Sequence, residues 1–205
     1  MTTYAKLRTD IVAWTNNEST ELAAALDTII SLAELRVYRE LDLRIFRKSA
    51  GGSTTVGNQF LPLPDDCLVV RSLRLADGTH LLNRDESFIR EFWPDPAITS
   101  VPRYYAPWDE TTVLLAPTPN QSYAVQLVYT RQPAGIGPGN TTTWLSLFAY
   151  DLLLYASLLE AAGYLEGVTA ERMEMYQTRY TDAAQRVQTQ DARNRGDDFL
   201  TRSAG

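Results

Sequence analysis

Residues 102–167 read PRYYAPWDETTVLLAPTPNQSYAVQLVYTRQPAGIGPGNTTTWLSLFAYDLLLYASLLEAAGYLEG, and this stretch decides the fold. Its first part predicts three short strands over residues 103–108, 112–116 and 123–130, the last with alternating apolar and polar side chains. A loop rich in Gly, Pro, Asn and Thr follows. The stretch ends in a nearly all-apolar helix over residues 144–165, which must be covered on most sides by the rest of the chain or by a partner.

The sequence on either side of this stretch predicts helices at both ends of the chain and strands between them. Apolar residues recur at helical spacing over residues 4–14, 20–41 and 170–187. Strand-like segments at 43–49 and 68–75 are followed by turn signals at Ala50–Ser53 and at 76–79, and a short helix is expected over 85–93.

The sequence therefore predicts an α+β fold in which one antiparallel β domain is inserted into a helical bundle. Residues 1–42 and 141–191 would form the bundle, residues 43–140 the β domain, and residues 192–205 a flexible polar tail. The β domain is a sandwich or a small barrel, and the sequence leaves both open.

Composition argues against several classes of function. The chain has 205 residues, 19 basic and 25 acidic, for a net charge of −6, which disfavours a surface that grips nucleic acid throughout. Cys67 is the only cysteine, so no disulfide forms within the chain. Asp151 lies in the middle of the apolar helix, where a membrane span would make it costly, so no membrane association is expected.

No residue pattern points to catalysis, a metal or a cofactor. His80 is the single histidine and follows a predicted turn, and Gly135, Gly137 and Gly139 lack the lysine of a phosphate-binding loop. Asp65, Asp66 and Asp85 lack the spacing of a calcium loop. We therefore expect a protein that is not an enzyme and that has no catalytic, metal or cofactor residues.

Segments along nearly the whole chain, residues 3 to 190, resemble one family in the same order. They are TYAKLRTDIVAW, LDTIISLAELRVYREL, LPLPDDCLVVRSLRL with DGTHL, the strand region from Pro102 to Pro133, and TTWLSLFAYDLLLYASLLEAA. These segments resemble bacteriophage head-to-tail adaptor proteins, the tail-tubular-protein-A-like proteins of short-tailed phages. The shared motifs consist of packing residues and carry no catalytic signature.

This resemblance implies a structural virion protein that forms a ring, typically of 12 copies, at the phage neck. The ring would join the portal protein to the tail nozzle or tube protein and let DNA pass through its channel without specific binding, after assembly in the host cytoplasm. The resemblance places portal or subunit contacts on the helical end and the tail. The residues expected there are Trp144, Phe148, Tyr155, Phe199 and Leu200.

Two other functions remain alternatives. A monomeric α+β interaction module would use the apolar helix only as the core of its bundle. A tail-associated hydrolase would need a carboxylate pair such as Glu86 with Glu91 or Asp109 with Glu110, but pairs this close in sequence are poorly suited to the opposed geometry of glycosidases.

Overall fold

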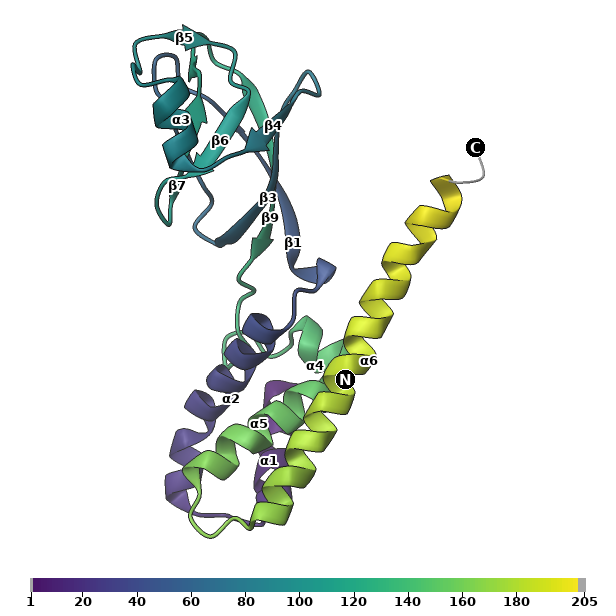
Figure 1. Cartoon of the computed structure of the whole chain (residues 1–205). Helices are drawn as coiled ribbons and strands as arrows, with labels where there is room; N and C mark the ends of the chain where they lie inside the picture. Colours follow the sequence, from purple (N-terminus) through teal and green to yellow (C-terminus); the bar gives the residue numbers. More distant parts are fainter. Residues whose placement is uncertain (1, 203–205) are drawn as a thin grey trace. The chain divides into compact units, whose positions relative to one another are not determined.

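The computed structural model describes the backbone of residues 2–202 and the side chains of residues 2–193. It has the α+β fold that the sequence predicts (Figure 1). The chain divides into two compact units. The helical unit contains the chain up to Leu43 and from Ala134 onward, and the β unit contains Arg44–Pro133.

In the helical unit, the central helix α5 packs against the four other helices. These elements are α1 (Tyr4–Thr15), α2 (Thr20–Glu40), α4 (Trp144–Phe148), α5 (Tyr150–Tyr164) and α6 (Ala170–Arg202). Helix α5 is apolar almost all round, and its neighbours cover it, so that eight of its residues are buried. Tyr176, Tyr180 and Val187 form the buried side of α6, whereas Met173, which the sequence also assigns to that side, is exposed.

Short polar side chains cap the N-termini of two of these helices. Thr3 accepts a hydrogen bond from the backbone N–H of Lys6, and Ser19 accepts one from Leu22. These bonds satisfy backbone donors that have no partner within the helix. At the other end of the unit, α6 continues as a helix to Arg202, through the segment for which the sequence predicts a tail.

The single helix predicted over residues 144–165 is in fact two helices, α4 and α5. Ala149 separates them with φ −139° and ψ 47°, outside the helical region. Its N–H still bonds to the carbonyl oxygen of Leu145, and its own carbonyl oxygen accepts the N–H of Leu153. The break therefore changes the direction of the chain while the backbone groups on both sides stay paired.

The β unit is built on one seven-stranded sheet with the order β1-β9-β3-β4-β6-β7-β2. The strands are β1 (Arg47–Ser53), β2 (Phe60–Pro62), β3 (Cys67–Leu75), β4 (His80–Asn83), β6 (Tyr104–Pro107), β7 (Thr112–Ala116) and β9 (Ala124–Arg131). A 3-10 turn, η1 (Arg44–Phe46), precedes β1, and β5 (Thr99–Ser100) pairs with β8 (Thr118–Pro119) in a separate ribbon.

The sheet is mixed, and this corrects the prediction of a purely antiparallel β domain. Strands β4 and β6 run parallel, with Leu82 opposite Tyr104. Parallel neighbours need a crossover connection. The short helix α3 (Glu86–Phe92) lies within that connection and packs on β6.

The two halves of the curled sheet enclose one core. It contains Leu73, Leu127 and Tyr129 from β3 and β9, together with Tyr105, Val113 and Leu115 from β6 and β7. A second, smaller cluster lies on the outer face of β6 and β7, where Ile89 of α3 packs against Ala106, Leu114 and Ala116. Helix α3 therefore covers one side of the β unit, as Figure 1 shows.

The turn predicted at Ala50–Ser53 is wrong, because these residues form the second half of β1. They pair in regular antiparallel register with β9, from Ala50 opposite Leu127 to Ser53 opposite Ala124. A Cβ atom on Gly52 would lie 3.5 Å from a methyl carbon of Val125, an ordinary contact. Tertiary pairing here overrides the turn preference of the Gly-Gly pair.

Candidate assembly surfaces

The α4 helix begins with a capping box. The Thr143 hydroxyl accepts the backbone N–H of Ser146, and the Ser146 hydroxyl accepts the backbone N–H of Thr143 at 2.9 Å. Leu145 and Ser146 face inward and are buried. The cap and these two residues fix the direction of a helix of only five residues.

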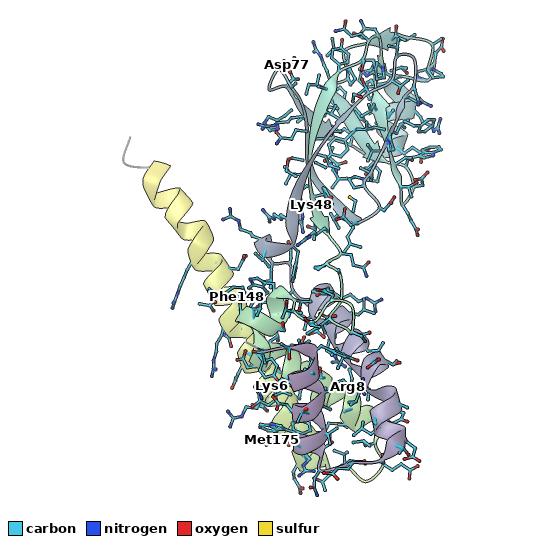
Figure 2. All side chains as sticks on the ribbon, turned by 180° about the vertical axis from the view of Figure 1, so that it is seen from behind. Lys6, Arg8, Lys48, Asp77, Phe148 and Met175 are labelled. Atoms are coloured by element: carbon cyan, nitrogen blue, oxygen red, sulfur yellow. The ribbon has the colours of Figure 1, made fainter. Side chains whose placement is uncertain are left out.

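The outward side of α4 presents apolar side chains. Phe148 is 72% exposed and Leu147 is 40% exposed. Figure 2 shows Phe148 projecting from the surface of the helical unit. The half-buried Trp144 ring lies beside Phe148, with centroids 6.1 Å apart. We call Trp144, Leu147 and Phe148 the α4 surface. An exposed phenylalanine beside a half-buried tryptophan and an exposed leucine is typical of a contact surface.

The other expected interface residues do not join this group. Tyr155 is half-buried in α5, where its ring meets Trp14 of α1 edge-on at a centroid distance of 5.8 Å. Trp14 is itself partly exposed, so this pair borders the surface at another place. Phe199 and Leu200 lie outside the residues whose side chains the structure describes.

Two tyrosine hydroxyls, from the half-buried Tyr150 and the buried Tyr180, link the helices around α5. The Tyr150 hydroxyl donates to Asp10 of α1, and the Tyr180 hydroxyl donates to Glu40 of α2. Burial, followed by the adjacent carboxylate, raises the pKa of both tyrosines, so both remain protonated donors at neutral pH. The residue after the Ala149 break is thereby tied to α1.

Glu34 is the one carboxylate among the described residues that is nearly fully buried, with 3% exposure. It accepts the backbone N–H of Ile136 at 2.8 Å and the hydroxyl of Tyr38 at 3.3 Å. Burial raises its pKa, and these hydrogen bonds partly oppose that effect. The bond from Ile136 attaches the Gly/Pro loop to α2, so Glu34 has a structural role.

The side chains considered for catalysis are separate from one another or occupied by local bonds. His80 is exposed on β4, and Cys67 is half-buried against the β core, where burial raises the pKa of its thiol. Glu86 pairs with Arg90 at 2.7 Å along α3, and Asp109 accepts the backbone N–H of Thr111 at 2.8 Å in a turn. Neither carboxylate pair has the arrangement of a hydrolase active site.

The aspartates do not form a metal site in the part of the chain that the structure describes. No group of three or more His, Cys, Asp or Glu residues there is placed to hold an ion. Asp66 instead accepts the Tyr129 hydroxyl at 2.6 Å and the Lys48 ammonium at 2.9 Å. These bonds lower the pKa of Asp66, with the tyrosine bond contributing most.

Sequence reasoning missed several exposed apolar residues. Leu147 and Trp14 are exposed on the helical unit, and Phe92 is 59% exposed on α3. Their exposure depends on how the helices and strands pack, and the amino-acid sequence alone does not indicate it. Among residues 2–202, none of the helices is both long and apolar enough to cross a membrane.

Comparison with known proteins gives one family. The family described as SU10 adaptor protein matches residues 2–200, nearly the whole chain. No curated protein matches this sequence. Adaptors of this family are structural phage proteins that contact other head and tail proteins of the virion. The match covers nearly the whole chain, and the chain belongs to the SU10 adaptor family of phage head-to-tail adaptor proteins.

Proposed function

We propose that copies of this chain assemble into a ring, most simply of 12 copies, that joins the portal protein to the tail nozzle or tube protein. Phage DNA passes through the channel of this ring without sequence-specific contact. The ring is part of the virion neck, is assembled in the host cytoplasm and catalyses no reaction. Membership of the adaptor family supports this proposal, and so does the acidic net charge of −6, which disfavours retention of DNA.

The exposure of the α4 surface is the observation that supports a contact with the portal protein. Phe148 and Leu147 project from a capped helix whose inward side is anchored by Leu145. Burying a phenylalanine side chain contributes about 1.5–3 kcal/mol, and a ring repeats this contribution in every copy. We assign portal contact to Trp144, Leu147 and Phe148, with Tyr155, Phe199 and Leu200 as the further contact residues expected from the family resemblance.

Electron microscopy of the purified chain, alone and mixed with the portal protein of the same phage, tests the ring. We expect a ring stacked coaxially on the portal, or a free ring of matching symmetry. Monomers in both samples would overturn the proposal and favour a monomeric interaction module.

A serine at position 148 tests the portal contact. Phe148→Ser should weaken portal association at least about tenfold, the equivalent of about 1.4 kcal/mol, while the unfolding midpoint changes little because the side chain is mostly exposed. Val56→Ser is the matched control, because Val56 is also an exposed apolar residue but belongs to the β unit. Equal portal binding by both variants would contradict the assignment of the α4 surface.

A further inference from the structure

One face of the β unit is cationic although the chain as a whole is acidic. Strands β1, β3, β4 and β9 contain five Lys or Arg residues and no Asp or Glu. The chain as a whole has 25 acidic and 19 basic residues. Such a separation of charge affects which surfaces attract each other on association. It does not determine the fold.

The pairing of the strands places three arginines on the outer face of this half of the sheet. Along β9, Gln126 and Thr130 alternate with the core residues Leu127 and Tyr129, so they face away from the core. The Nε of Arg71 donates to the Thr130 hydroxyl at 2.9 Å. The remaining arginines lie on the same face.

Arg74 donates through Nε to the Gln126 amide oxygen at 2.6 Å, and Gln126 in turn donates to Ser49 of β1 at 3.0 Å. Arg47 lies opposite Thr130 in the β1–β9 register and is exposed. We call Arg47, Arg71 and Arg74, with Ser49, Gln126 and Thr130, the arginine face. No carboxylate contacts Arg47 or Arg74 among the described residues.

The opposite side of the same unit carries two exposed carboxylates and an exposed aromatic ring, beside Arg84 and the Glu86–Arg90 ion pair. Asp85 and Glu91 are exposed at the two ends of α3, and neither side chain has a hydrogen-bond or ion-pair partner among residues 2–193. Phe92, beside Glu91, has 59% of its surface exposed. We call Asp85, Glu91 and Phe92 the α3 face.

The two faces point in opposite directions. Leu73 and Leu127 from one half of the sheet share a single core with Val113 and Leu115 from the other half, so the outer sides of the two halves face away from each other. Helix α3 covers the outer side of β6 and β7. The arginine face is the outer side of β1, β9 and β3, at the other side of the unit in Figure 1.

We propose that the arginine face of one copy binds the α3 face of the next copy, and that this contact closes the ring. The inference rests on the proposed ring and names the surfaces that form it. A ring of identical chains requires a heterologous contact, in which two different and complementary patches lie on opposite sides of each copy. Charge pairs steer and orient the contact, and Phe92 supplies an apolar anchor.

A second copy fits this face better than nucleic acid does. Two of the three guanidinium groups already bond to Thr130 and Gln126, whereas tight DNA binding requires many phosphate contacts. The arginine face has no aromatic side chain on which a base could stack. A surface with two unpaired carboxylates and an exposed aromatic ring is present on the chain itself.

Charge reversal of each face in the full-length chain tests the contact. Arg47→Glu/Arg74→Glu makes both faces negative, and Asp85→Lys/Glu91→Lys makes both positive, so each variant alone should remain mostly unassembled. We expect the protein concentration at half-assembly to rise at least about tenfold for each. Mass photometry and electron microscopy, with portal present if wild-type rings need it, provide the readout.

Mixing the two variants gives the decisive measurement. A negative arginine face then meets a positive α3 face at one contact, and the original pair meets at the next, so rings of alternating copies should form. Combining all four substitutions in one chain should also restore rings. Glu18→Lys/Glu110→Lys is the control: it changes net charge as much as the α3 variant but alters neither face, and it should assemble like wild type. Circular dichroism verifies the folding of every variant.

Three outcomes would overturn the inference. Rings from either reversed variant at the wild-type concentration would remove this contact while leaving the proposed function in place. Failure of the mixture to assemble, when both variants are folded, would show that the two faces do not meet. Normal rings that lose binding to duplex DNA in the Arg47/Arg74 variant would assign the arginine face to nucleic acid instead. If the wild-type chain forms no ring even with portal, the proposed function fails first.

Discussion

Replacing Glu34 with alanine tests the role of the buried carboxyl in the helical unit. The substitution removes the acceptor for the backbone N–H of Ile136, which is itself buried. An unpaired buried donor costs about 1–3 kcal/mol. Glu34→Gln retains an oxygen acceptor and should therefore lose less stability than Glu34→Ala.

The loss should also depend on pH, because burial raises the pKa of Glu34. A carboxyl with a raised folded-state pKa binds its proton more tightly in the folded chain. Its stabilising contribution is fully present below the unfolded pKa of about 4.3 and decreases as pH rises through the folded pKa. The stability difference between wild type and either variant should therefore be largest near pH 4 and smaller at pH 7.

Urea unfolding followed by circular dichroism at 222 nm, which reports mainly on the helices, measures both effects. With a slope of about 2 kcal/mol per M, the expected loss moves the midpoint by roughly 0.5–1.5 M. Glu174→Ala, an exposed position on α6, is the matched control and should leave the midpoint unchanged. If Glu34→Ala matched that control, or if its deficit grew with rising pH, the assignment of Glu34 would be refuted.

Three further substitutions test contacts within the two units by the same unfolding measurement. Gly135→Ala places a Cβ 2.9 Å from the Glu34 Oε2 and should cost about 1–3 kcal/mol; an unchanged midpoint would mean that Glu34 can move away. Asp66→Ala removes the acceptor of the Tyr129 hydroxyl and should cost a similar amount at pH 7. The lowered pKa of Asp66 means that wild type loses this contribution as pH falls below about 3.9, so the two curves should converge in acid; a constant difference would argue against it. Ile89→Ala opens a cavity beneath α3 and should cost about 2–5 kcal/mol, and a smaller loss would indicate that α3 is only loosely packed.

The sequence predicted the elements whose local pattern agrees with their packing. The helical period over Thr20–Glu40 produces a helix whose apolar stripe is buried, from Leu22 to Val37. The hairpin at Asp77-Gly78 forms because Gly78 adopts φ +92°, which other residues rarely do. These predictions depend on short-range preferences alone, because the local pattern of each element agrees with its packing.

The features that the sequence did not predict depend on contacts between distant residues. Ala149 is a good helix former, and no Gly or Pro marks the break there. No local pattern indicates that Tyr150 bonds to Asp10, 140 residues away. The parallel pairing of β4 with β6 likewise depends on where α3 packs.

The candidate surfaces also depend on contacts between distant residues, so the sequence alone does not predict them. Apolar residues fill positions 144–165 so evenly that no helical face stands out, and the exposure of Phe148 follows from the break at Ala149. The arginine face is assembled from three strands that are far apart in the chain. Only the strand register, such as Arg47 opposite Thr130, brings its members together.

The first and last strands of the β unit are neighbours, and this makes the unit an exchangeable module. Strand β1 begins at Arg47 directly opposite Thr130 near the end of β9. The chain therefore leaves the helical unit and returns to it through two adjacent, hydrogen-bonded strands. A short linker could replace everything between them, or another domain with adjacent ends could be grafted in. Related chains could in this way acquire a different β unit while retaining the same helical unit.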